Sequence, residues 1–299
     1  MFGQLGSVLG QLSAVILPVL VIAGIGFIWA RAGRRFDSVF LTDIVTNIGT
    51  PCLVAHSLTT LEVAPEALAQ MGEAALLAIA GFCILGLITL KLMRLSLNSY
   101  LPALTFPNTG NMGLPLSLFA FGESGLALAV VYFACTVTLQ FTLGISISAG
   151  NLSLSRLVRT PTIYAVVISV LVLTFDIPVP VWIDNTIGVL GGLTIPMMLL
   201  TLGVSIATLK VHALGRNLLL SCIRMGGGFL IALAVTQFFD LSPVAAGVLI
   251  IQSSMPVAVF NFLFAQYYGR AHADVAAMVV ISTALSFLTL PLLTLFVLP

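Results

Sequence analysis

The chain has 299 residues, of which 60% are hydrophobic and 7% are charged, and its mean hydropathy is +1.19. This composition excludes a soluble globular domain, because apolar runs long enough to cross a bilayer recur from end to end. The net charge of +1 gives no reason to expect nucleic acid as a partner. Neither disulfides nor a metal site are expected, because the cysteines stand far apart in apolar segments: Cys52, Cys83, Cys135 and Cys222.

We expect an all-α membrane protein with ten transmembrane helices. The spans lie at about 8–29, 38–58, 73–93, 100–120, 124–148, 161–180, 184–207, 214–238, 243–266 and 274–298. Divided after the fifth span, the chain forms two repeats, residues 1–150 and 151–299. Five is an odd number of helices, so the second repeat would insert upside down relative to the first.

Prolines and polar residues recur at nearly one offset, which supports this inverted repeat. Pro51 and Pro196 are 145 residues apart, and Pro107 and Pro256 are 149 residues apart. Two polar pairs recur at an offset of 146 residues: Thr136 with Ser282, and Gln140 with Ser286.

The charges predict the orientation of the spans. Ten of the eleven basic residues follow odd-numbered spans: Arg31, Arg34, Arg35, Lys91, Arg94, Arg156, Arg159, Lys210, Arg216 and Arg270. Seven acidic residues lie in or beside the other loops: Glu62, Glu66, Glu73, Glu123, Asp176, Asp184 and Asp240. The positive-inside rule then places both termini on the outer side of the membrane. We therefore expect a multi-pass protein of the cell (inner) membrane.

The fourth span (100–120) is interrupted by the stretch TFPNTGNMGLPLS. Pro107 lacks a backbone N–H, so a regular helix should not continue through it. Free backbone groups at membrane depth are tolerated only against protein or a water-filled cavity. Asn108, Thr109, Asn111 and the amides of the following half-helix form a donor-rich end that suits an anionic group. A simple proline kink remains the alternative.

The ninth span (243–266) carries a second interruption at Pro256, with Asn261 and the run Gln252, Ser253 and Ser254 around it. Each half of the chain therefore places a broken helix at the corresponding position. Such a pair is typical of the central site of a secondary transporter.

Other polar residues are candidates for the substrate path. Asp43, Asn47 and Thr50 are spaced i, i+4, i+7 and should share one helix face that lines a cavity. Asp43 is a candidate proton or cation site, but solvation near the headgroups is the favoured interpretation. A cation-coordinating or cavity-lining role is expected for Thr136, Gln140, Ser282 and Ser286. Gln140 is the strongest of these four, because its amide is the costliest to bury unpaired.

Arg224 is the one basic residue well inside a span. It has two interpretations: pairing with a substrate carboxylate or with Asp43, or extension of its side chain to the membrane interface.

The string Gly122-Glu123-Ser124-Gly125 matches intramembrane serine proteases. Its serine would need a histidine base, and only His56, rather than His212 or His272, shares its side. We expect no enzyme.

The chain resembles a bacterial member of the auxin efflux carrier family, whose members are often described as permeases for malate or other organic acids. The resemblance rests on a few stretches: Pro107-Asn108-Thr109 with Asn111, Gly113, Leu114 and Pro115; Pro51; residues 194–203; and Pro256 with Asn261. The ninth span here has Met255-Pro256-Val257 where plant members have a Pro-Asn-Thr-type break.

The resemblance implies a fold like that of bile acid sodium symporters. Spans one, two, six and seven would form a scaffold, and the others a mobile core whose fourth and ninth spans cross at their breaks. Substrate would bind near Pro107, Asn108, Pro256 and Val257 and move by an elevator motion. A homodimer would form through the scaffold helices.

We therefore expect a secondary active transporter of a small organic anion, such as malate or an auxin-like acid. It would need no cofactor, and its coupling ion would be a proton or sodium. The alternatives are a sodium-coupled symporter and a membrane sensor that binds a carboxylate without moving it.

Overall fold

The computed structural model describes residues 17–18, 20–60, 64–150, 161–175, 177–208 and 213–297. Within these ranges the chain is helical and contains no strand, only one isolated antiparallel bridge between Pro107 and Val257. Outside them lie the predicted loop charges Glu62, Arg156, Arg159, Asp176 and Lys210, together with His212.

The first half contains a helix at Leu20–Arg31 and the elements α2 (Ser38–Ile44), η1 (Val45–Gly49), α3 (Thr50–Thr60), α4 (Pro65–Leu92), α5 (Leu97–Thr105), η2 (Thr109–Gly113), α6 (Leu114–Leu139), η3 (Gln140–Gly144) and α7 (Ile145–Ala149). The second half contains α8 (Pro161–Thr174), α9 (Val181–Gly192), α10 (Thr194–Thr208), α11 (Leu214–Val235), α12 (Pro243–Ser253), α13 (Val259–Tyr267) and α14 (His272–Val297). In the described ranges, the η segments are π-helical turns: η1 and η3 continue the α-helices on both sides, whereas η2 continues only into α6.

The expected membrane class is confirmed by helix length and composition. In the described part of the chain, five helices are long and apolar enough to cross a membrane: Glu66–Leu92, Thr109–Ala149, Val181–Thr208, Leu214–Val235 and His272–Val297. Shorter apolar helices occur at Leu20–Arg31, Pro161–Val172 and Pro243–Ser253. The protein is therefore an all-α, multi-pass membrane protein.

One helix boundary differs from the sequence-based expectation, and another agrees with it. The helix α4 begins at Pro65 rather than near residue 73, because proline suits the first turn of a helix and hydropathy marks only the apolar part. The expected boundary between the fourth and fifth spans is present, because the helical segment Thr109–Ala149 breaks at Gly122. Gly122 has φ 67° and ψ −157°, a conformation that side-chain-bearing residues rarely adopt.

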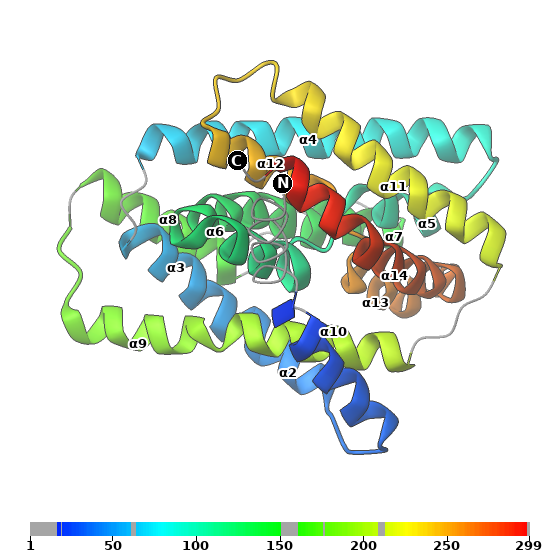
Figure 1. The fold of residues 1–299 in the computed structure, drawn as a ribbon, viewed down its shortest axis with the longest axis horizontal. Helices are drawn as coiled ribbons and strands as arrows, with labels where there is room; N and C mark the ends of the chain where they lie inside the picture. The colour runs from blue at the N-terminus through cyan, green and yellow to red at the C-terminus, as the bar shows by residue number, and fades with distance from the viewer. Residues whose placement is uncertain are drawn as a thin grey trace, which may run out of the picture.

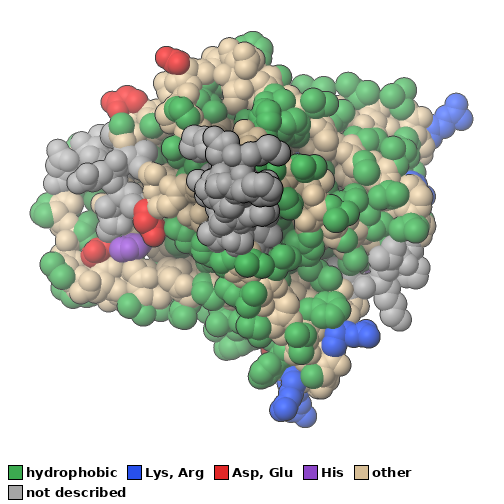
Figure 2. All heavy atoms as spheres, in the orientation of Figure 1, with side chains coloured by type: hydrophobic (Ala, Val, Ile, Leu, Met, Phe, Trp, Pro, Cys, Tyr) green, Lys and Arg blue, Asp and Glu red, His purple; other side chains and the backbone are tan. Residues whose placement is uncertain are grey.

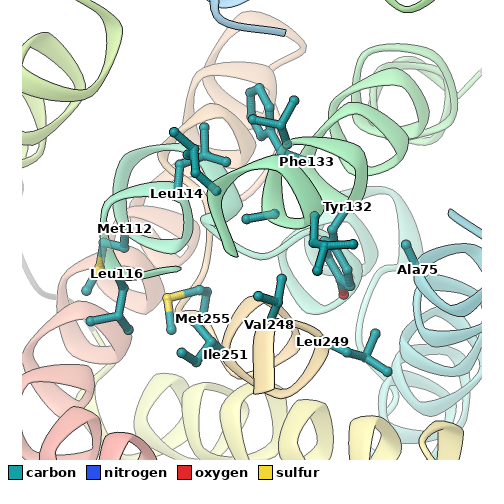
Figure 3. Close-up of a cluster of buried hydrophobic side chains, with 14 of the residues drawn as sticks. Ala75, Met112, Leu114, Leu116, Tyr132, Phe133, Val248, Leu249, Ile251 and Met255 are labelled. Carbon is teal, nitrogen blue, oxygen red and sulfur yellow. The ribbon is translucent and has the colours of Figure 1, made fainter. Parts of the chain in front are cut away.

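The core lies where α4, α6 and α12 meet. Figure 3 shows side chains from these helices and from η2 converging, including Ala75, Met112, Tyr132, Val248 and Met255. All five are buried. In Figure 1, α4 runs along the upper part of the view and α9 and α10 run below the centre, with α3, α6 and α8 between them and α2 below α10. This packing fixes both interrupted helices inside the protein.

Glycines set the closest helix approach, between Leu20–Arg31 and α10. A Cβ at Gly26 would collide with the carbonyl of Leu200, and a Cβ at Gly203 would collide with the carbonyl of Ala23. Small residues allow such backbone contact in membrane helices. By contrast, a Cβ at Gly192 would meet no atom within 4 Å.

Charged side chains lie at opposite sides of the molecule. Figure 2 shows Lys and Arg at the right and bottom of the view, and Asp, Glu and a histidine at the left and upper left. Hydrophobic side chains cover much of the surface between them. This separation matches the charge pattern of the loops.

Candidate functional site

The two interrupted helices pair with each other at their breaks. The segment between α5 and η2 meets the segment between α12 and α13 through two backbone hydrogen bonds. Asn108 N donates to Pro256 O at 2.7 Å, and Ala258 N donates to Phe106 O at 3.3 Å. The bridge between Pro107 and Val257 lies between these bonds. We call residues 106–108 and 254–258 the crossing. It satisfies backbone groups that the prolines release from helical bonding.

A cavity of about 60 Å³ lies against the crossing. One wall comes from η1, α3, α8 and α10, through Val45, Thr50, Thr162, Met198 and Thr201. The other wall comes from the crossing and from helices η2, α6, η3 and α13: Pro107, Asn108, Thr109, Gly110, Asn111, Phe133, Val137, Gln140, Ala258, Val259 and Phe260. The cavity thus brings together Pro107, Asn108, Thr109, Asn111, Thr50 and Gln140 of the residues expected from sequence.

The three π-helical turns of the described ranges border this cavity. Val45 lies in η1, residues 109–111 lie in η2, and Gln140 lies in η3. A π-turn widens a helix by one residue and occurs most often at functional sites. Three such turns from distant parts of the chain therefore converge on one space.

Asn108 offers the cavity an unused donor. Its side chain is 4% exposed, and its Nδ2 has no acceptor among the residues that the structure describes. Next to it, the amides of Gly110 and Asn111 lie in the first turn of the helix Thr109–Ala149, where backbone N–H groups lack intrahelical partners. The positive end of that helix and a free amide donor together suit an anionic oxygen.

A chain of side-chain amides supports the other side of the cavity. Gln140 Nε2 donates to Asn261 Oδ1 at 3.0 Å, and Asn261 Nδ2 donates to Phe106 O at 3.0 Å. Gln140 and Asn261 are both buried. Asn261 therefore stabilises the crossing by binding the Phe106 carbonyl at the end of α5. Gln140 orients the Asn261 side chain.

Replacing Gln140 with leucine is expected to lower the melting temperature by about 4–8 °C. It leaves Asn261 Oδ1 buried without its donor, which costs about 2 kcal/mol. The double variant Gln140→Leu/Asn261→Leu should be less destabilised than the sum of the single variants. Thr136→Val is the control, because the Thr136 hydroxyl donates only to Tyr132 O of its own helix. Additive effects in a thermal-unfolding cycle would contradict the amide chain.

The remaining crossing residues lie behind the cavity rather than in it. Pro256 and Val257 belong to the backbone pairing. Ser282 Oγ of α14 accepts a hydrogen bond from Val257 N at 3.0 Å, so it positions the second break. Ser286 Oγ donates to Thr283 O of its own helix. Thr136, Ser282 and Ser286 are buried but do not line the cavity.

The expected polar face of Asp43, Asn47 and Thr50 does not form. Thr50 is buried in the cavity wall, whereas Asp43 and Asn47 are exposed and Asn47 Nδ2 donates to Asp43 O at 3.0 Å. The reason is η1 (Val45–Gly49), which contains Asn47 and separates Asp43 from Thr50. A π-turn takes one extra residue, so the positions after it are rotated by about 100° from the α-helical pattern.

Arg224 neither reaches the membrane surface nor pairs with Asp43. It is 1% exposed, and its Nη2 donates to Ser253 O at 3.0 Å, at the end of α12. It is absent from the cavity lining. Arg224 therefore binds the end of α12 beside the crossing and does not line the cavity. It could act on an anion in the cavity only from a distance.

The apolar walls were not predicted as site residues. Val45, Phe133, Val137, Met198 and Phe260 lie in hydrophobic stretches that give no signal to separate them from lipid-facing positions. Thr201 and Thr162 are hydroxyl residues of the same wall. Only their position opposite the broken helices distinguishes them, and that position requires the fold.

The residues of the protease-like string do not approach a catalytic arrangement. The Ser124 hydroxyl is exposed and donates to Phe121 O at 3.3 Å. His56 Nδ1 lies 3.0 Å from Asp184 Oδ1 across α3 and α9. This carboxylate is an orienting partner for His56 that the sequence did not reveal, but it does not involve Ser124.

Comparison with known proteins places the chain among transporters. The model of a family described as membrane transport protein matches residues 147–294. An uncharacterized transporter of Methanothermobacter thermautotrophicus is 25% identical over 296 residues, covering 93% of this chain and 95% of that protein. An uncharacterized transporter of Methanocaldococcus jannaschii is 26% identical over 197 residues, 62% of this chain and 63% of that protein. The second half of the chain therefore matches the membrane transport protein family, and the first relative extends the similarity to a transporter across the first half.

Proposed function

We propose that this protein is a secondary active transporter of a small organic anion and that the anion binds in the cavity at the crossing. The observation that carries the proposal is Asn108, a residue that lines the cavity at a helix N-terminus and whose buried Nδ2 has no acceptor among the described residues. Leaving a buried donor unpaired costs about 1–3 kcal/mol, which binding of a carboxylate would recover.

The architecture proposed for transport is ten helices in two inverted repeats, with both termini outside. The paired breaks and the charge separation of the loops support it. The cavity walls also divide as the scaffold and mobile core would: η1, α3, α8 and α10 on one side, and the crossing with η2, α6, η3 and α13 on the other.

The size of the cavity supports relative movement of these two walls. Its volume of about 60 Å³ is far below the roughly 300–1,000 Å³ of typical small-molecule pockets. A carboxylate with a carbon body fits only when the walls separate. An elevator motion of the crossing along η1, α3 and α10 would supply that separation and carry the substrate.

The lining favours a monocarboxylate with an apolar body over a dicarboxylate. None of the described residues that line the cavity is basic, so a second carboxylate would lack a cationic partner. Phe133, Phe260, Met198, Val45 and Val137 instead offer apolar and aromatic surface opposite the donors. We therefore expect an apolar monocarboxylate such as indole-3-acetate to exchange at least about tenfold faster than malate.

Purified protein in liposomes tests this function. Labelled indole-3-acetate, an aliphatic monocarboxylate and malate are each followed as homo-exchange, and then as net uptake under imposed proton or sodium gradients. Exchange of a monocarboxylate with accumulation driven by a proton gradient is the expected result. Binding of a carboxylate without flux would instead indicate a sensor. Faster exchange of malate would overturn the substrate class.

A further inference from the structure

The helix α12 ends at the crossing with a carbonyl bound by a cation. The last four carbonyls of a helix lack intrahelical partners, and here the amides of Ser254 and Met255 turn back to residues 250–252. The carbonyl of Ser253 receives Arg224 Nη2 instead, at 3.0 Å. A guanidinium therefore lies at the negative end of the half-helix.

The surroundings of this guanidinium hold no compensating carboxylate. Within the described ranges, the ion pairs are His56 with Asp184 and Arg216 with Asp274, and Arg224 belongs to neither. Its Cζ lies 4.3 Å from the centre of the Phe82 ring of α4. The partial negative charge of α12 and the face of this ring are thus its counterparts.

The protein is shaped to accept the charge at this point. A Cβ at Gly228, one turn after Arg224 in α11, would collide with the same Ser253 carbonyl, so glycine lets α11 approach the helix end. From α6, the Tyr132 hydroxyl lies 2.9 Å from Ser253 Oγ, and Figure 3 shows this ring beside α12. Three helices therefore enclose the end of α12.

The two half-helix ends at the crossing are treated differently. At the end of α5, the Phe106 carbonyl receives only neutral donors, Ala258 N and Asn261 Nδ2. Of these two helix ends, only the end of α12 binds a permanently charged group, the Arg224 guanidinium. In transporters with broken helices, carbonyls at half-helix C-termini are where the coupling cation binds.

We propose that Arg224 is a resident cation that occupies the cation position at the end of α12. The inference rests on the transport function proposed above, and it implies that transport needs no sodium or other metal cation. Because α11 and α12 are tied together by this contact, the positive charge would move with the crossing and accompany the bound anion.

The test is chemical rescue of a variant that empties the position. Arg224→Ala removes the guanidinium and leaves room for a free guanidinium ion, whereas Arg224→Met removes the charge and keeps the space filled. Monocarboxylate exchange in Arg224→Ala liposomes should fall roughly 10- to 30-fold and recover in about 20 mM guanidinium chloride relative to choline chloride. Arg224→Met should fall equally and not recover, and Arg224→Lys should keep at least about a third of the wild-type rate.

A second readout does not depend on transport. In detergent, the melting temperature of purified Arg224→Ala should rise by about 3–5 °C at the same guanidinium concentration, because an ion that binds only the folded state stabilises that state. The wild-type and Arg224→Met proteins should show no such rise. If the wild type exchanges no carboxylate, the proposed function fails, while this thermal shift still tests the position of the cation.

Three results would overturn the proposal. They are a sodium requirement in the wild type, wild-type exchange in Arg224→Met, and an Arg224→Ala protein that is neither rescued nor stabilised by guanidinium. If Arg224→Ala does not fold, the wild-type comparison of sodium with choline and the Arg224→Lys and Arg224→Met rates decide the question.

Discussion

Replacing Asn108 with aspartate is expected to slow carboxylate exchange by about a thousandfold. The change places a negative charge on a cavity-lining residue whose buried amide donor has no acceptor among the described residues. Two like charges about 4 Å apart repel by about 4 kcal/mol at the effective dielectric of a protein site, which is about a thousandfold in binding. The measurement is homo-exchange of a monocarboxylate in liposomes at equal amounts of reconstituted protein.

Asn47→Asp is the matched control for this variant. Asn47 is an asparagine of a neighbouring wall helix, but its side chain is exposed and bonds only the Asp43 carbonyl. Its exchange rate should stay within about twofold of the wild type. Equal loss in both variants would show that added negative charge acts generally. Wild-type exchange in Asn108→Asp would remove Asn108 from the site.

Replacing Gly203 with alanine is expected to lower the melting temperature by about 6–12 °C. The added methyl group would collide with the Ala23 carbonyl, a backbone atom that has no rotamer through which to escape. The helix Leu20–Arg31 and α10 would have to move apart, at a cost of about 3 kcal/mol. Thermal stability followed by size-exclusion chromatography in detergent measures the shift.

Gly192→Ala serves as the comparison for Gly203→Ala. A Cβ at Gly192 meets no atom within 4 Å, and alanine favours helix more than glycine does, so stability should be unchanged or slightly raised. The close contact between the two helices would be disproved by equal melting temperatures of the Gly203→Ala and wild-type proteins.

Sequence reasoning located the two breaks because proline has a physical consequence that does not depend on the fold. Pro107 and Pro256 cannot donate to a helix, so each marks a place where backbone groups need other partners. The identity of those partners was beyond the sequence. The hydrogen bond from the backbone N–H of Asn108 to the carbonyl of Pro256 follows only from how the helices pack.

The rest of the site escaped prediction for two physical reasons. A π-turn has no compositional mark, so the α-helical spacing of Asp43, Asn47 and Thr50 could not predict that η1 separates Asp43 from Thr50. Apolar cavity walls such as Phe133 and Met198 look like lipid-facing residues, because both environments select hydrophobic side chains. Gln140 was found because a buried amide requires a partner.

The crossing also has a consequence for the order of synthesis. Asn108 N and Phe106 O are satisfied by residues that follow about 150 positions later in the chain. At a ribosomal rate of roughly 5–20 residues per second, these groups wait roughly 8–30 s for their partners. During that interval the first half, once inserted, must hold unpaired backbone within the membrane, where lipid offers no hydrogen bonds. The break in the first half can therefore form its backbone hydrogen bonds only after the second half has been synthesised.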